Sequence, residues 1–172
     1  MSPEGRRSGE RPKFIADSMH GKLARWLRLL GYDSVYARSD DDRLLLEAEG
    51  SGRVLVTSDV ELHRLAVKRG VRSVLVPLED VERQLAAIAE EVSREFGLDI
   101  EEFFEPEATR CSLCNGELIE EGDGRHYVCA SCGQRYWEGS HWPRIERTLE
   151  SARRLALKRS RDASRTRASE TG

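Results

Sequence analysis

The sequence predicts an α/β protein with a four-stranded, mostly parallel sheet flanked by helices, followed by a small zinc ribbon and a C-terminal helix. Two observations predict this fold class. Short apolar runs alternate with amphipathic, helix-like stretches from residue 13 to about residue 105, which is typical of parallel strands covered on both faces. After a linker, two Cys-x-x-Cys pairs at 111–114 and 129–132 have the spacing of a zinc ribbon.

Four apolar runs are predicted to be strands, and a helix is expected after each. The runs cover residues 14–16, 34–37, 53–57 and 73–77. After the first run, leucines and a tryptophan recur at helical spacing until Gly31, where we expect the helix to end. The second helix opens at the acidic run 40–42, and the third ends near Gly70. Asp80 is placed to cap a long fourth helix whose apolar face extends to Phe96.

The pattern breaks at residues 98–109, which form an acidic linker containing two phenylalanines. The C-terminal helix is predicted from apolar residues on one face with arginines on the other. The polar, charged ends of the chain have too few apolar residues to pack. The expected divisions are the strand-and-helix domain at 13–105, the ribbon at 110–142, the C-terminal helix at 143–160, and disordered tails at 1–11 and 161–172.

The four cysteines are predicted to bind one structural zinc ion. Two sulfurs from a single turn reach one metal only if the backbone turns tightly, and Asn115, Gly116 and Gly133 favour such turns. Four protein ligands leave no open coordination position, so this zinc would stabilise structure. The predicted ligands are Cys111, Cys114, Cys129 and Cys132. The alternative, two disulfides in a secreted protein, is disfavoured because we find no signal-peptide pattern.

Charge is distributed unevenly along the chain. Residues 1–13 carry four basic and two acidic side chains, and residues 144–172 carry nine basic and four acidic, which leaves a net charge of −10 for residues 14–143. An acidic central region between basic ends is compatible with an acidic metal site accompanied by basic terminal segments. No apolar run approaches membrane-spanning length, so we expect a soluble, cytoplasmic protein without membrane contact.

Three acidic positions are predicted to meet at one edge of the sheet. Asp17 and Asp59 directly follow the first and third strands, and the acidic run 40–42 follows the second. Ligands of open α/β sheets gather beyond the carboxyl ends of the strands, and clustered carboxylates need a cation such as Mg²⁺ or Mn²⁺. From the run we select Asp41, which the helix phase leaves in the first turn, without excluding its two neighbours. The alternative is that the acids only cap the helices that follow them.

Several motifs then follow one another in a recognisable order. They are Phe14-Ile-Ala-Asp17, Gly21-Lys-Leu-Ala-Arg25-Trp-Leu-Arg28, Val54-Leu-Val-Thr57-Ser-Asp59, the two cysteine pairs, and Tyr136-Trp137-x-Gly139-Ser-His141-Trp142. Over about residues 13–150 the chain resembles the Mut-seven C-terminal RNase domain family, whose members resemble PIN nucleases and carry a C-terminal zinc ribbon. The resemblance implies a PIN-like domain and a metal-dependent ribonuclease, with catalytic acids at Asp17, within 40–42 and at Asp59. PIN nucleases usually hold four acids, of which three are placed here.

Basic and aromatic side chains are candidates for substrate contact. Lys22, Arg25 and Arg28 lie on the first helix. Lys22 and Arg25 fall within its first two turns, where the helix dipole disfavours cations and an anionic partner would favour them. The alternative is an ordinary solvated face paired with nearby acids. The segment 136–142 gathers aromatic residues and a histidine, which either stack single-stranded bases or pack the ribbon against the first domain.

The sequence thus predicts a ribonuclease that hydrolyses RNA phosphodiester bonds at a Mg²⁺ or Mn²⁺ site, with single-stranded RNA as its partner and one structural Zn²⁺. The alternative is a catalytically inactive adaptor that binds RNA or a protein partner, in which the acids only cap helices. The distances between the carboxylates of Asp17, Asp41 and Asp59 distinguish the two, because like charges perturb each other strongly within about 4–6 Å.

Overall fold

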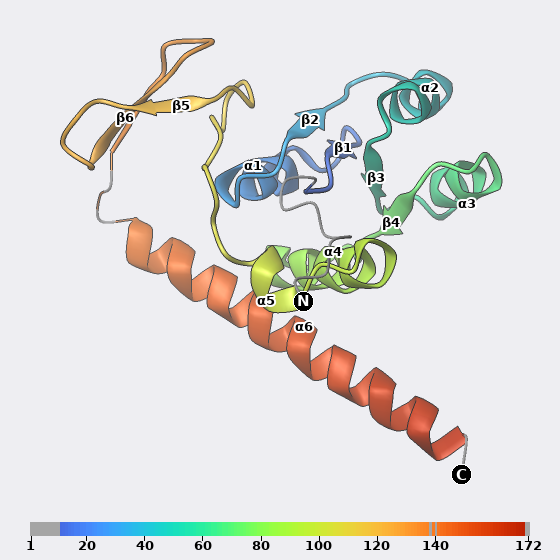
Figure 1. Ribbon diagram of the computed structural model, residues 1–172. Helices are drawn as coiled ribbons and strands as arrows, with labels where there is room; N and C mark the ends of the chain where they lie inside the picture. Colours follow the sequence, from blue (N-terminus) through green and yellow to red (C-terminus); the bar gives the residue numbers. More distant parts are fainter. Residues whose placement is uncertain (1–10, 138, 140, 171–172) are drawn as a thin grey trace, which may run out of the picture.

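The computed structural model describes residues 11–137, 139 and 141–170, which form two sheets and six helices (Figure 1). The elements are β1 (Phe14–Ala16), α1 (Gly21–Leu29), β2 (Ser34–Tyr36), α2 (Asp41–Ser51), β3 (Val54–Thr57), α3 (Val60–Lys68), β4 (Ser73–Leu75), α4 (Val81–Phe96), α5 (Ile100–Phe103), β5 (Leu118–Glu120), β6 (His126–Cys129), β7 (Arg135–Trp137) and α6 (Trp142–Glu170). Strands β1 to β4 form a parallel sheet in the order β2-β1-β3-β4. Strands β5 to β7 form a separate antiparallel sheet. The predicted fold class is confirmed.

The parallel sheet carries apolar side chains on both faces, and helices cover each face. Because successive residues of a strand point to opposite faces, Phe14, Val54 and Val56 join one apolar cluster. Ile15 and Leu55 join the other. The first cluster includes residues of α1, α4, α5 and α6, and the second includes residues of α2 and α3. Burial on both faces is the reason that these strands read as uninterrupted apolar runs.

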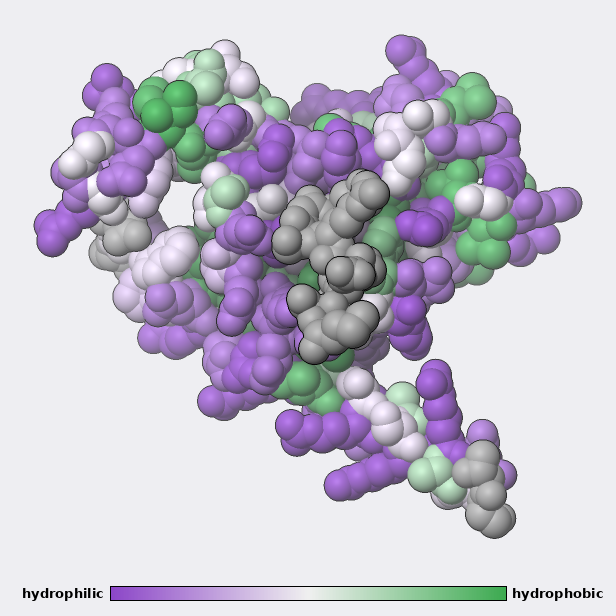
Figure 2. All heavy atoms as spheres, viewed as in Figure 1, coloured by the Kyte–Doolittle hydropathy of each residue, from purple (hydrophilic) through white to green (hydrophobic). Residues whose placement is uncertain are grey.

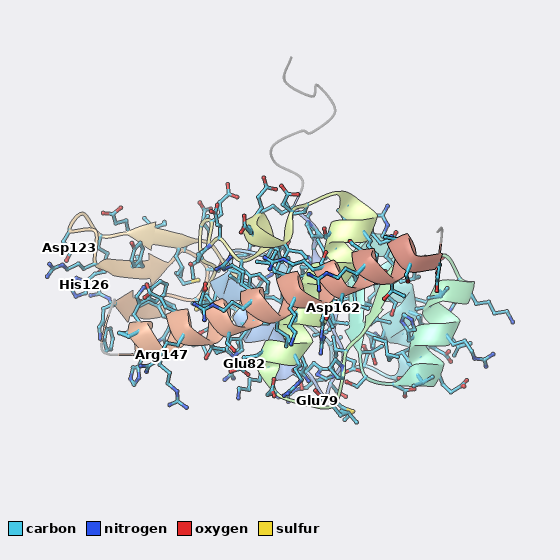
Figure 3. All side chains as sticks on the ribbon, turned by 90° about the horizontal axis from the view of Figure 1, so that it is seen from below. Glu79, Glu82, Asp123, His126, Arg147 and Asp162 are labelled. Atoms are coloured by element: carbon cyan, nitrogen blue, oxygen red, sulfur yellow. The ribbon has the colours of Figure 1, made fainter. Side chains whose placement is uncertain are left out.

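Helix α6 adds a further layer by packing against α4, as Figures 1 and 3 show from two directions. Its buried residues Leu149, Ala152 and Ala156 recur at spacings of three and four, which places them on one face of the helix. None of the helices in the described part of the chain is both long enough and apolar enough to cross a membrane.

The end of α6 differs from the prediction of a helix at 143–160 followed by a disordered tail at 161–172. The helix continues to Glu170, although residues 161–170 are exposed throughout. No glycine or proline occurs between residues 144 and 170, so nothing in the local sequence interrupts the helical hydrogen bonds. The last two residues of the predicted tail lie outside the described part of the chain.

The predicted N-terminal tail, residues 1–11, lies outside the described residues except for Arg11. The Nη1 atom of Arg11 donates to the carbonyl oxygen of Leu30 at 3.0 Å, and its guanidinium lies 3.9 Å from the centre of the Tyr32 ring. Arg11 is therefore fixed against the end of α1 by a hydrogen bond and a cation–π contact.

The predicted linker at 98–109 contains the short helix α5, which periodicity did not identify. Ile100 and Phe103 of α5 are buried in the first apolar cluster, and the Phe103 ring stacks on the Tyr32 ring with centroids 4.9 Å apart. Four residues are too few to show a helical period, so this helix depends on its tertiary contacts.

Gly31 lets the linker pass close to the end of α1. Its φ is +93°, and a Cβ atom built there would lie 1.7 Å from the carbonyl oxygen of Glu107. The backbone N–H of Glu107 donates to the carbonyl oxygen of Leu30 at 3.3 Å. The chain is thus held against α1 just before the cysteine ribbon begins.

We expect Gly31→Ala to lower the free energy of unfolding by about 3 kcal/mol, because both the positive φ and the lack of room oppose a Cβ atom. Gly52→Ala is the matched control, since Gly52 has a φ of +68° but no atom within 4 Å of a built Cβ. It should cost only about 1 kcal/mol. Urea-induced unfolding followed by circular dichroism measures both variants, and equal destabilisation would contradict the importance of the close approach.

Candidate functional site

The four cysteines of the ribbon come together in an arrangement that could hold a zinc ion. Their sulfur atoms all lie within 4.8 Å of one another. The sulfur atoms of Cys111 and Cys132 are 3.7 Å apart, and those of Cys114 and Cys129 are 3.4 Å apart. A tetrahedral zinc ion with bonds of about 2.3 Å places its sulfur ligands about 3.8 Å apart, which these separations fit. All four are free thiols, so the disulfide alternative is not met.

The backbone of the second Cys-x-x-Cys turn favours the thiolate form of Cys129, the form that zinc requires. Backbone N–H groups of Cys132 and Ser131 approach the Cys129 sulfur at 3.5 and 3.4 Å. These hydrogen bonds outweigh burial and lower the pKa of the Cys129 thiol to about 6. Asn115 and Gly133, the residues after the two pairs, have φ angles of +68° and +77°, so the predicted tight turns are confirmed.

Arg28 joins the first cysteine turn to α1 and β2. Its side chain is buried, with Nε donating to the carbonyl oxygen of Ser34 at 2.8 Å and Nη1 to that of Ser112 at 2.6 Å. Burial lowers the pKa of this guanidinium, while the nearby Cys111 and Cys114 raise it. Burial of Arg28 and these two hydrogen bonds to carbonyl groups indicate a structural role, and substrate contact by Arg28 stays an untested prediction. Its positive charge lies beside the cysteines that would carry negative charge around zinc.

Asn115 makes a second connection between the ribbon and the parallel sheet. Its Oδ1 accepts from the backbone N–H of Ser34 at 3.0 Å, and its Nδ2 donates to Oδ1 of Asp33 at 2.6 Å. The same Asp33 oxygen pairs with Arg53 at 2.8 Å. Burial would raise the pKa of Asp33, but the hydrogen bonds from Arg53 and Asn115 hold it below its ordinary value. The first cysteine turn thus shares one polar network with the turn between α1 and β2.

Asp17 lies buried at the carboxyl end of β1 and is linked to the end of β3. Its Oδ2 accepts a hydrogen bond from the hydroxyl of Thr57 at 2.5 Å, and its Oδ1 accepts from the backbone N–H of Met19 at 3.1 Å. The Thr57 hydroxyl in turn accepts from the backbone N–H of Asp59 at 3.0 Å. One hydroxyl therefore brings the segments of Asp17 and Asp59 together.

Capping explains some of these acids but not Asp17. Asp59 caps α3, since its Oδ1 accepts from two backbone N–H groups of the first turn at 2.9 and 3.1 Å. The cap of α2 is Asp40, and Asp41 is the exposed first residue of that helix. The N-cap of α1 is His20 rather than Asp17. The buried carboxylate of Asp17 thus has no role as a helix cap.

Thr57 links two of the three predicted acids, and no side-chain contact among the described residues links the third to them. Within the described ranges, the cysteine cluster is the one group of three or more Cys, His, Asp or Glu residues with ligand atoms within 4.8 Å of one another. The carboxylates of Asp17, Asp41 and Asp59 do not form such a group. Asp17 and Asp59 are connected through Thr57, whereas Asp41 stands at the start of α2. The assignment of all three to one metal site stays a prediction.

His20 belongs to this edge, although sequence reasoning gave it no role. It is 5% exposed, its Nε2 lies 2.8 Å from the Ser58 hydroxyl, and the same nitrogen lies 3.9 Å from Oδ1 of Asp17. Because the Ser58 hydroxyl donates to the carbonyl of Val76 at 2.9 Å, the imidazole is the donor to Ser58. Burial lowers the pKa of His20, partly offset by the charge of Asp17. The Asp-x-x-His spacing was the signal that could have identified it.

Lys22 and Arg25 are exposed on α1, and neither makes an ion pair or a hydrogen bond with any residue in the described part of the chain. By contrast, exposed arginines of other helices pair with neighbouring glutamates, as Arg64 does on α3 and Arg154 on α6. The alternative of a surface face paired with nearby acids is therefore not met for these two cations. They stay candidates for contact with an anionic substrate.

The aromatic segment after the last cysteine divides between the two predicted roles. The Tyr136 hydroxyl lies 3.1 Å from the Cys111 sulfur and 3.1 Å from the Ser112 hydroxyl, so it helps to hold the ribbon together. Trp137 is 69% exposed and His141 is exposed as well. Their side chains therefore do not pack the ribbon against the sheet domain.

Together, the fold and the site define a small α/β domain with aspartates at the carboxyl edge of a parallel sheet and a four-cysteine ribbon attached to it. The family model described as the Mut7-C RNAse domain matches residues 12–125 and 119–149. The chain belongs to the Mut7-C RNAse domain family, as its motifs indicate. The family name suggests a ribonuclease role and an RNA substrate. No curated protein and no solved structure matches the chain.

We expect Asn115→Gly to lower the free energy of unfolding by about 2–3 kcal/mol. Glycine keeps the positive φ, but the Ser34 N–H and the Asp33 carboxylate each lose the hydrogen bond to the Asn115 side-chain amide. Asn115→Ala should cost roughly 1 kcal/mol more, because alanine also opposes the backbone conformation. Chemical denaturation of the zinc-loaded protein measures both, and a glycine variant as stable as the wild type would show that the amide contributes nothing.

Cys129→Ser should abolish stoichiometric zinc binding, because it removes one of four thiolates. Structural zinc contributes on the order of 10 kcal/mol to the folding of small zinc modules, so the ribbon should become protease-sensitive. Metal analysis of the purified protein and limited proteolysis test both effects. Ser131→Ala, in the same turn, is the control and should retain zinc. A Cys129→Ser protein that still holds one zinc per chain would refute the ligand assignment.

Proposed function

We propose that this protein is a metal-dependent ribonuclease that hydrolyses phosphodiester bonds of single-stranded RNA at the carboxyl edge of its parallel sheet. Membership of the Mut7-C RNAse domain family supports a nuclease role. The observation that carries the proposal is the buried carboxylate of Asp17, which pairs with no lysine or arginine among the described residues. A buried carboxylate is costly unless a cation compensates it, and Mg²⁺ or Mn²⁺ fits its oxygen ligands.

In this proposal Asp17, Asp59 and Asp41 hold the ion. Asp59 uses only Oδ1 to cap α3, which leaves its Oδ2 for a ligand, and the exposed side chain of Asp41 is free to turn toward the edge. When bound, the ion supplies an activated water and stabilises negative charge on the phosphate. Lys22 and Arg25 would neutralise neighbouring phosphates of the RNA. Free thiols and an RNA substrate support a cytoplasmic location.

A catalytically inactive adaptor that binds RNA or a protein partner is the second candidate. It is favoured by the helix cap that Asp59 forms and by the finding that, among the described residues, the three acids do not form a group with ligand atoms within 4.8 Å of one another. In an adaptor, Asp17 would serve only to connect β1 to β3 through Thr57. The two candidates differ in whether any RNA bond is broken.

Incubation of the zinc-loaded protein with end-labelled single-stranded RNA, with and without Mn²⁺ or Mg²⁺, tests the proposal. Asp17→Asn and Asp59→Asn should each lower metal-dependent cleavage by about 100-fold or more, since each removes a charge that holds the ion. Asp99→Asn is the matched control, because Asp99 is an exposed aspartate that precedes α5 and makes no side-chain cap. If the wild type binds RNA without cutting it under any of these conditions and Asp17→Asn binds equally well, the adaptor is correct.

A further inference from the structure

A cleft of about 580 Å³ lies where α1, the ribbon and the start of α6 meet. All three tryptophans of the chain line it, together with two tyrosines of the ribbon sheet and one arginine of α1. These residues are Trp26, Tyr127, Tyr136, Trp137, Trp142 and Arg25. Figure 2 shows the surface hollowed between the ribbon and the body of the molecule, above the first turn of α6. The cleft is thus the place where the aromatic surface of this protein is concentrated.

The aromatic side chains of the cleft are largely available for contact. Trp137 is 69% exposed, and Trp26, Tyr127 and Trp142 are partly exposed. Tyr127 and Tyr136 are paired directly across β6 and β7, which places their rings on one face of the ribbon sheet. Exposed aromatic rings of this size are costly to leave in water unless a ligand covers them.

The charge around the cleft favours an anion. No aspartate or glutamate in the described part of the chain lines it, although residues 14–143 as a whole carry a net charge of −10. Arg25 lines the cleft and makes no ion pair or hydrogen bond within the described residues. A surface that combines an unpaired cation with exposed aromatic rings is typical of sites for single-stranded nucleic acid.

We propose that this cleft binds unpaired bases of single-stranded RNA and positions the strand on the acidic edge of the sheet. RNA as the occupant rests on the proposed function. The volume of the cleft lies within the range of ligand sites and leaves room for a base with its ribose. The bases stack on the tryptophan rings, and Arg25 contacts a phosphate.

Helix α1 connects this cleft to the acidic edge. It begins four residues after Asp17, and its exposed cations Lys22 and Arg25 stand three residues apart on the same side of the helix. At about 1.5 Å of rise per residue, Arg25 lies about 6 Å along the axis from Gly21, the first residue of α1. A strand held in the cleft can therefore follow Arg25 and then Lys22 toward Asp17.

Intrinsic tryptophan fluorescence tests the proposal, because every tryptophan lines the cleft. The zinc-loaded protein is titrated with a ten-nucleotide oligouridylate without added Mg²⁺ or Mn²⁺, so that binding is measured apart from cleavage. The expected result is quenching by the RNA, with at least about 10-fold weaker binding of an abasic oligonucleotide of the same charge. Equal affinity for the two probes, or no quenching by RNA, would overturn the proposal.

Variants locate the binding to the cleft. Trp137→Ala should weaken oligouridylate binding about 10-fold, Trp137→Phe should largely restore it, and Ile119→Ala, an exposed apolar residue of the same ribbon outside the cleft, should have no effect. Arg25→Ala should weaken binding of both the RNA and the abasic probe, whereas Lys68→Ala on α3 should not. RNA affinity unchanged by Trp137→Ala would overturn the proposal.

Two further outcomes show which ligand occupies the cleft and whether RNA binding is accompanied by RNA cleavage. Quenching by a proline-rich decapeptide but not by oligouridylate would overturn the proposal in favour of a protein partner, since aromatic grooves also bind such peptides. Base-dependent binding together with no cleavage in Mn²⁺ or Mg²⁺ would support the cleft and refute the ribonuclease proposal alone.

Discussion

The structure depends on the buried hydrogen bonds that join the first cysteine turn to the end of α1 and the start of β2. Arg28 donates to carbonyl groups on both sides of this junction, and Asn115 bridges Ser34 and Asp33. A buried guanidinium is costly to desolvate, so it persists only because carbonyl groups and nearby cysteines compensate its charge. The ribbon has too small a core to be stable alone, and the junction lets it share the stability of the sheet domain.

This junction also decides how the functional surfaces are arranged. Helix α1 begins four residues after Asp17 and carries Arg28 in its last turn, so one rigid element connects the ribbon to the acidic edge. Between its ends, α1 presents Lys22, Arg25 and Trp26 toward solvent or the aromatic cleft. Zinc in the ribbon would therefore contribute to RNA binding only by holding one wall of the cleft, because its four cysteine ligands leave no position for a substrate.

At the acidic edge, the same side chains serve structure and the proposed chemistry. Thr57 connects Asp17 to the backbone of Asp59, and Asp59 in turn caps α3. His20 is buried beside them and donates to Ser58. Such a network positions the carboxylates of adjacent strands before any ion binds, which is the arrangement that charge stabilisation in a reaction requires. Asp41 is outside this network and is the acid whose role depends most on a bound ion.

The sequence by itself determined the four strands, the helices that follow them and the four-cysteine cluster, because each has a pattern that can be read from residues close together in the chain. It also placed Asp17 and Asp59 at one edge, since the ends of parallel strands must coincide. Only the tertiary structure decided that Arg28 is buried, that His20 joins the acidic edge and that the three tryptophans line one cleft. Burial of a side chain depends on partners far away in the chain, such as Ser112, which lies 84 residues from Arg28. The local spacing of apolar residues contains no information about such a contact.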